Sequence, residues 1–243
     1  MTKLNVPFYA STNNKHLECL EVFVHTFNHY IPEQELRILG YDEPSYDLPD
    51  NCKFISMGEQ GDVSEWSTDL RKYFLNSNDD YFIYGTEDVF FYETPKIDYI
   101  NYLLERMRDN FVGRIQLTDG EEEHDGTLEI NTCYDVKLIE NIIGNPWGDF
   151  KLFELIASEY VINTQYSLWN KEYFLKYMID GMTPWQFEIE GSKRASHDSK
   201  YDVWMLDGSI PIRKKEGYGA GGWEHVDYWV DVLSDELRER VLR

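Results

Sequence analysis

Apolar and polar positions in the first half of the chain form short apolar runs that alternate with stretches of helical spacing. Apolar runs over residues 4–10, 36–40 and 111–117 each lead into polar turn residues, as buried strands do. Between the first two runs, apolar residues recur at helical spacing over 15–29 and stop just before Pro32. This part of the sequence therefore predicts a strand, a helix and a second strand, with a later strand near the middle of the chain.

The segment between these strands continues the alternation. A brief strand is predicted at 54–55, followed by a helix with Ser64 or Ser67 as its N-cap. The apolar run 80–84 predicts a further strand, and a helix over 95–108 has proline in its first turn. Strands that alternate with helices are typical of an α/β fold with a largely parallel sheet.

The second half of the chain is less regular. Spacing predicts helices near 134–143, 170–179, 184–193 and 226–241, and the glycine-rich stretch 217–222 predicts a mobile loop. The chain has 243 residues, of which 42% are hydrophobic, and its sequence shows no internal repeat and no long linker. It is long enough for one large core, so we expect a single domain.

Charge argues against two classes of partner. The chain carries 23 Lys and Arg against 45 Asp and Glu, a formal net charge of -22, which opposes binding to phosphate backbones and anionic lipid. No apolar stretch reaches the roughly 18 residues of a membrane span, and the amino terminus lacks a signal-peptide core. Cys19, Cys52 and Cys133 are too widely spaced for a zinc site. We expect a cytoplasmic protein without nucleic acid partners or membrane insertion, whose aromatic content leaves room for a homodimer surface.

Two adjacent acids, Glu87 and Asp88, follow the strand predicted at 80–84. In an open α/β sheet, ligands bind outside the carboxyl ends of the strands, because the loops diverge there. Two neighbouring carboxylates repel each other, and a hard divalent cation such as Mg²⁺ or Mn²⁺ offsets that repulsion and can hold a diphosphate. The local pattern fits a solvated acidic turn equally well.

Several ordered motifs resemble a known family. The run from Trp66 through Arg71 to "DDYFIYGTEDVFF", with "SLWNKEYFLKYM" and "TPWQFEIEGS" downstream, is similar to bacterial and viral glycosyltransferases of the nucleotide-diphospho-sugar transferase (GT-A) type. The resemblance covers most of the chain. It implies a Rossmann-type mixed, mostly parallel sheet flanked by helices, in one domain over 1–243. Within it, 1–118 would bind the nucleotide sugar and 119–243 would form the acceptor side.

The resemblance also implies a nucleotide site around the first two predicted strands. Base and ribose would contact Tyr9, Ser11, Thr12 and Asp42. Ser11 and Thr12 have a local explanation as well, because either can cap the helix that follows. Arg71 lies away from the centre of the apolar stripe of its helix, so its guanidinium would reach a phosphate of the donor. A surface arginine paired with a nearby acid is the alternative.

A metal site is implied by the same comparison. Glu87 and Asp88 stand where the family has its metal-binding Asp-x-Asp motif, although here the acids are contiguous and a strict Asp-x-Asp is absent. Many enzymes of this fold complete the site with a histidine near the carboxy terminus, beside a loop that closes over the donor, and His225 has that position here. Trp66 is included in the donor site by the resemblance, although a core position is the more usual role of such a tryptophan.

The stretch "TPWQFEIEGS" predicts a helix start. Thr183 and Gln186 form a capping box, with proline at the first helical position. These local rules give no reason for Glu188, and a carboxylate just inside a helix that begins at a cleft suits a general base. The alternative is an ordinary first-turn acid favoured by the helix dipole. Asp119 and Glu190 are the other acids considered for the catalytic role.

Together these features predict an inverting glycosyltransferase of polysaccharide biosynthesis that uses a nucleotide-diphosphate donor such as a UDP-sugar, with Mn²⁺ or Mg²⁺. With 7 Trp and 18 Tyr, a catalytically silent carbohydrate-binding or assembly module on the same fold is the alternative. A silent module has no need of Glu87, Asp88 and Glu188 together. A nucleotidyltransferase would need a glycine-rich basic loop after the first strand, and "YASTNNKH" contains no glycine there.

Overall fold

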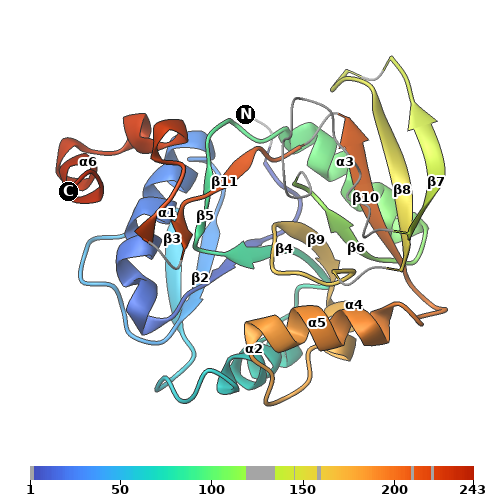
Figure 1. The fold of residues 1–243 in the computed structure, drawn as a ribbon, viewed down its shortest axis with the longest axis horizontal. Helices are drawn as coiled ribbons and strands as arrows, with labels where there is room; N and C mark the ends of the chain where they lie inside the picture. Colours follow the sequence, from blue (N-terminus) through green and yellow to red (C-terminus); the bar gives the residue numbers. More distant parts are fainter. Residues whose placement is uncertain (1–2, 119–134, 145, 158–159, 209–210, 220–221) are drawn as a thin grey trace.

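A computed structural model describes residues 3–118, 135–144, 146–157, 160–208, 211–219 and 222–243 (Figure 1). In these residues a mixed sheet of nine strands, in the order β3-β2-β1-β4-β9-β6-β10-β8-β7, forms the centre of the molecule. In chain order its strands are β1 (Phe8–Ser11), β2 (Leu36–Gly40), β3 (Cys52–Ser56), β4 (Tyr81–Thr86), β6 (Val112–Gln116), β7 (Asp135–Ile142), β8 (Phe150–Ala157), β9 (Ser167–Asn170) and β10 (Asp202–Gly208).

Helices cover both faces of this sheet. They are α1 (Leu17–Tyr30), α2 (Glu65–Asn76), α3 (Ile97–Asp109), α4 (Lys171–Tyr177), α5 (Pro184–Ala195) and α6 (Asp235–Val241). Buried residues of α1, α3 and α6 belong to one hydrophobic core, and those of α2, α4 and α5 belong to a second core on the other face. The fold is therefore the expected α/β sheet flanked by helices. Within the described residues, no helix is both long and apolar enough to cross a membrane.

The sheet combines a parallel half with antiparallel insertions. β3, β2, β1 and β4 run parallel to one another, and β10 runs parallel to β6. β9 lies antiparallel between β4 and β6, while β8 and β7 extend the sheet antiparallel beyond β10. Because β10 from the second half of the chain pairs with β6 from the first half, both halves contribute to one sheet.

Alternation along the central strands explains the two cores. Phe8 of β1 belongs to the core on the α1 side, whereas the next residue, Tyr9, belongs to the core on the α2 side. On β4, Ile83 and Phe82 divide in the same way. All four side chains are fully buried, so these strands are covered on both faces, as their nearly continuous apolar runs predict.

A small sheet brings the carboxy-terminal part of the chain to the end of β4. β5 (Val89–Phe91) pairs antiparallel with β11 (Lys214–Glu216), and β12 (Tyr218–Gly219) pairs with β13 (Gly222–Trp223). The Gly217 N–H donates to the Asp88 carbonyl at 2.7 Å. The described part of 217–222, predicted as a loop, thus follows β11 directly and contributes to a short hairpin.

The segment 134–143 is where the sequence prediction of a helix is wrong. Its described part contains β7, which pairs with β8 along nearly its whole length. Val136, Ile139 and Ile142 fall at spacings that a helix also permits, but their β-branched side chains favour an extended backbone. The partner strand β8 therefore decides the conformation.

The single helix predicted over 226–241 is also wrong. This segment forms two 3-10 turns, Val226–Tyr228 and Val230–Val232, before α6 begins. The Ser234 hydroxyl accepts a hydrogen bond from the Leu237 N–H at 3.3 Å, so a new N-cap starts a separate helix at this point.

Candidate functional site

The carboxyl ends of three neighbouring parallel strands lie level at one edge of the sheet. Ser11, the last residue of β1, is in register with Leu39 of β2 and Thr86 of β4. The Ser11 hydroxyl shares a hydrogen bond of 2.7 Å with the Tyr84 hydroxyl. We call this place, where β1, β2 and β4 end, the strand-end edge. It is the edge at which open α/β sheets bind their ligands.

Glu87 is anchored inside the protein at the strand-end edge. The residue is 3% exposed, and its Oε1 accepts a hydrogen bond from the Thr12 hydroxyl at 3.2 Å. The same oxygen lies 3.1 Å from Nδ1 of His16, in the 3-10 turn that precedes α1. Burial raises the pKa of Glu87, and the hydrogen bond to Glu87 raises the pKa of His16. Glu87 therefore ties the turn after β4 to the start of α1.

Asp88, the next residue, has a different environment. Its Oδ1 accepts a hydrogen bond from the Thr86 hydroxyl at 2.6 Å, and its side chain is half-buried. Its backbone carbonyl accepts from the N–H groups of Gly217 and Tyr218. The backbone of the turn is thus fixed from both sides, which gives the Asp88 carboxylate a defined position at the strand-end edge.

Glu188 of α5 is the third acid of the site. Its Oε1 accepts hydrogen bonds from the Thr164 N–H at 2.7 Å and the Thr164 hydroxyl at 2.8 Å. Burial raises the pKa of Glu188, while the hydrogen bonds from Thr164 and the positive charge of Arg114 oppose this. Two residues after Thr164, the Tyr166 hydroxyl donates to the Thr86 carbonyl at 3.3 Å, so the segment that holds Glu188 also contacts the turn that carries Asp88. Glu190, two residues further along the helix, is exposed.

A buried cation lies behind these acids. Arg114 of β6 is 0% exposed, in the apolar stretch "FVGRIQL". Its guanidinium donates to the Ser167 hydroxyl at 3.0 Å, to the Val161 carbonyl at 2.7 Å, and to the side-chain oxygens of Gln116 and Asn163. The sequence prediction missed Arg114, His16 and Thr164, and a single arginine inside an apolar run was the one signal available for any of them.

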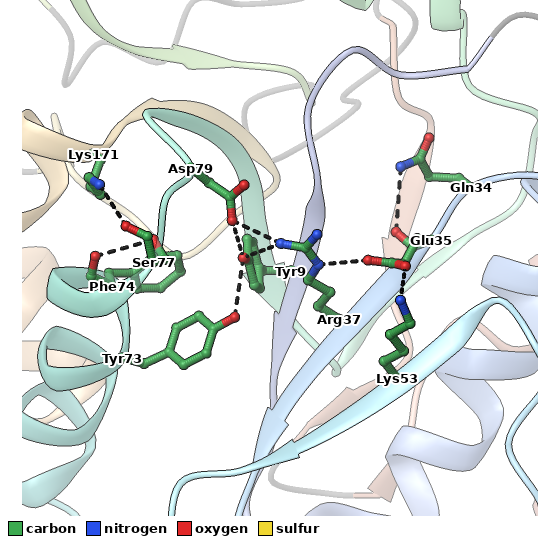
Figure 2. Close-up of polar contacts among 10 residues, drawn as sticks. All are labelled: Tyr9, Gln34, Glu35, Arg37, Lys53, Tyr73, Phe74, Ser77, Asp79 and Lys171. Carbon is green, nitrogen blue, oxygen red and sulfur yellow. Dashed lines mark hydrogen bonds and ion pairs between the residues drawn. The ribbon is translucent and has the colours of Figure 1, made fainter.

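Tyr9 turns away from the strand-end edge. Figure 2 shows its hydroxyl between Asp79, Arg37 and Tyr73: it donates to the Asp79 carboxylate at 2.6 Å and accepts from Arg37 at 2.7 Å. Asp79 precedes β4 and Arg37 is the second residue of β2, so this network lies at the amino ends of the strands. Burial raises the pKa of Tyr9 well above its usual range. The contacts of this side chain are structural.

Arg71 and Trp66, both predicted for the donor site, connect α2 to other helices. The Arg71 guanidinium donates to the Leu175 carbonyl and, at 2.9 Å, to the Met178 carbonyl, at the end of α4. Trp66 is 8% exposed, and its ring centroid lies 5.8 Å from that of Phe187 in α5. These contacts account for both residues without a ligand.

Asp42 and His225 contact residues other than Glu87, Asp88 and Glu188. Asp42, beyond the end of β2, accepts a hydrogen bond from the Asn14 side chain at 2.7 Å. His225 has a left-handed backbone with φ of 49°, and its ring lies 6.3 Å from that of Tyr228. Asp119 falls outside the residues that the structure describes. The strand-end edge therefore brings together Ser11, Thr12 and Asp42 with Glu87 and Asp88, and the histidine that contacts Glu87 is His16 and not His225.

The described part of the chain contains no complete set of protein ligands for a metal ion. No three His, Cys, Asp or Glu side chains there are grouped so that they could bind one. Of the predicted ligands, Glu87 is buried against His16 and Thr12, while Asp88 is half-buried and bonded to Thr86. Mg²⁺ in phosphate-binding sites needs only one or two carboxylates, because substrate oxygens and water complete its shell.

Two hollows lie elsewhere on the described surface. One of about 380 Å³ is formed by α2 and the end of β3, with lining residues Ser56, Met57, Asp69, Lys72, Tyr73, Asn76 and Ser77. Another of about 340 Å³ lies between the end of α1 and the start of α3. Neither is lined by the three acids of the site.

Comparison with known proteins gives no relative by sequence, since no family model and no curated protein matches the chain. Solved structures that resemble it include S. aureus TarS, with a TM-score of 0.47, 6% identity, and coverage of 100% of this chain and 42% of that one. They also include the bifunctional IspDF from Campylobacter jejuni, with a TM-score of 0.41, 11% identity, and coverage of 88% and 52%. The chain thus spans about half or less of each of these proteins.

Proposed function

We propose that this chain is a glycosyltransferase that moves a sugar from a nucleotide-diphosphate donor, such as a UDP-sugar, to a hydroxyl of a glycan or polysaccharide. The observation that carries the proposal is Glu188, a half-buried carboxylate held by Thr164, in a segment whose Tyr166 is bonded to the turn before Asp88. Burial raises the pKa of Glu188 above its ordinary value. A carboxylate with such a pKa is a better proton acceptor at neutral pH than an exposed one.

In this proposal Glu188 is the general base that activates the acceptor hydroxyl. Both hydrogen bonds from Thr164 go to Oε1, so we assign proton acceptance to Oε2. Oε2 removes the proton of the acceptor hydroxyl while its oxygen forms a bond to the anomeric carbon. The bond from that carbon to the diphosphate breaks, and the electron pair leaves with the phosphate oxygen. A single displacement of this kind inverts the configuration at the anomeric carbon.

In this proposal Asp88 acts on the sugar-nucleotide donor. A diphosphate carries negative charge that Asp88 and Glu188 repel, so it must arrive with a cation. We propose that Mn²⁺ or Mg²⁺ enters with the donor and that the Asp88 carboxylate is its protein ligand, since such ions combine one or two carboxylates with phosphate oxygens. The cation would neutralise the charge that develops on the leaving diphosphate. Ser11 and Thr12 are hydroxyls at the same edge that can meet the nucleoside.

The alternative is a carbohydrate-binding module without catalysis. The hydrogen bonds that Glu87 and Asp88 receive from Thr12 and Thr86 would serve such a module equally well, because they also fix the turn. A silent module would bind glycans but would bind no sugar nucleotide. Donor binding therefore separates the two functions.

The test is calorimetry with a panel of sugar nucleotides, with and without Mn²⁺. The variants are Asp88→Asn and, as a matched control, Asp180→Asn, an exposed acid that faces Arg71. We expect one donor to bind only with Mn²⁺, and to lose at least tenfold in affinity in Asp88→Asn but not in the control. A folded protein that binds no donor would refute the transferase and favour the silent module.

A further inference from the structure

Trp185 is exposed to solvent beside the proposed base. Its side chain is 65% exposed, whereas the other described tryptophans are buried or half-buried: Trp66, Trp147, Trp169, Trp204, Trp223 and Trp229. Large aromatic side chains contribute strongly to binding, and their indole combines an apolar face with a polar N–H. An exposed tryptophan near a proposed active site is therefore informative about what binds there.

Trp185 is placed one helical turn before Glu188. Residues three apart on a helix are surface neighbours, with roughly 5–6 Å between their Cβ atoms. Phe187 and Gly191 are buried and set the inner face of α5, while Ile189 is 44% exposed. Glu188 is half-buried, so it lies at the border between the inner face and the exposed side on which Trp185 lies.

The start of α5, which carries Trp185, is fixed in place by hydrogen bonds. Thr183 and Gln186 form a reciprocal capping box at the start of α5. The Met182 N–H donates to the Ser67 hydroxyl of α2 at 2.7 Å, which ties this helix end to the second core. A ligand that stacks on Trp185 would thus meet a surface whose position relative to Glu188 is fixed in advance, and little ordering entropy would be lost.

The charge of this region selects the class of ligand. The charged residues of α5 nearest to Trp185 in sequence are Glu188 and Glu190, whereas Lys193 and Arg194 lie in the last turn, so an anionic ring at Trp185 would be repelled. A neutral pyranose has a face of C–H groups that can stack on an indole and a rim of hydroxyls that can bond to carboxylates. Such a ring spans about the separation of neighbouring side chains on one helix face.

We propose that Trp185 is the stacking platform for a neutral pyranose ring of the acceptor, which it holds so that one hydroxyl meets Glu188. This inference rests on the proposed function for the identity of the ligand as an acceptor. Binding of the sugar itself does not require catalysis. Trp185 is a positioning residue, because the proton goes to Glu188.

The test uses tryptophan fluorescence with acrylamide as a quencher. Subtracting the signal of Trp185→Phe from that of the wild type isolates the exposed indole. The probes are maltotriose, cellotriose, chitotriose and mannotriose. We expect at least one to lower the quenching constant of Trp185 at least twofold, and its affinity to fall about tenfold in Trp185→Ala. Ile189→Ala, an exposed apolar neighbour, is the control and should change the affinity less than twofold.

Other outcomes would overturn the inference. The inference fails if none of the four sugars shields Trp185 from acrylamide. It also fails if shielding grows with protein concentration in the absence of sugar, because a second copy of the chain would then cover the indole. Glu188→Gln should retain shielding, which separates sugar binding from proton transfer. If a sugar shields Trp185 but no sugar nucleotide binds, the platform stands and the transferase function fails.

Discussion

Glu87 and Asp88, the two adjacent acids at the end of β4, are chemically alike but have different environments. Glu87 is buried against His16 and Thr12, whereas Asp88 is half-buried and bonded to Thr86 in its own turn. A buried carboxylate with its own partners resists leaving them for a ligand, because each lost hydrogen bond would leave a buried group unsatisfied. The structure thus separates a buried anchor, Glu87, from a half-buried acid, Asp88, which is the one that the proposed function assigns to the donor.

This division predicts opposite effects for two conservative substitutions. Glu87→Gln should lower the free energy of unfolding by about 1–2 kcal/mol, since it disturbs buried hydrogen bonds to His16 and Thr12. Donor affinity should remain within about twofold. Asp88→Asn should weaken donor binding at least tenfold, about 1.4 kcal/mol, with unchanged stability. Chemical denaturation and calorimetry on the same samples measure both quantities. Loss of donor binding in Glu87→Gln with retained stability would contradict the assignment.

Glu188 also predicts how activity depends on pH. Its carboxyl must be deprotonated to act as a base, and burial raises its pKa above the ordinary value of about 4.3. The ratio kcat/KM should therefore rise with pH through this raised pKa and level off above it. Glu188→Gln should abolish the rise and lower kcat by about 10²–10⁴-fold. Glu190→Gln, an exposed acid on the same helix, should leave the profile unchanged. A rise that persists in Glu188→Gln would assign the base elsewhere.

At the scale of elements, Arg71 joins α2 to α4 and is predicted to stabilise rather than to bind phosphate. Its guanidinium satisfies carbonyls at the end of α4, which a helix leaves without partners. Arg71→Ala should lower the free energy of unfolding by about 1–2 kcal/mol, and Arg71→Lys by less, because lysine reaches one carbonyl at best. Donor affinity should not change. A tenfold loss of donor affinity in Arg71→Lys would restore the phosphate role that the sequence implies.

The elements that sequence predicts best are those whose local signals agree. α5 starts where the capping box of Thr183 and Gln186 places it, and β2 occupies its apolar run without change. β7 was missed because its residues satisfy a helical spacing, and only the partner β8 decides between the two. β9 inserts antiparallel between β4 and β6, and no local pattern in "SLWN" encodes that partnership.

At the scale of the whole molecule, the site is assembled by contacts that span the chain. His16 meets Glu87 across 71 positions, and Thr164 meets Glu188 across 24. The sequence pointed to the acid pair through its place at the end of an apolar strand, and to Glu188 because the capping rules of its helix do not require it. It could not predict their partners, because polar residues such as Thr164 carry no periodic signal, and pairing depends on how the sheet is ordered.

The net charge of -22 belongs to the whole molecule and predicts a response to salt. Like charges on a compact surface repel more than in the unfolded chain, and this repulsion is screened as the Debye length falls from about 30 Å at 0.01 M salt to about 8 Å at 0.15 M. Tm should therefore rise over this range of NaCl. Replacing the exposed acids Asp50 and Glu59 by lysine should raise Tm at low salt and reduce the response. A Tm that falls with salt, equally in both proteins, would mean that attractive pairs such as Arg37 with Asp79 outweigh the repulsion.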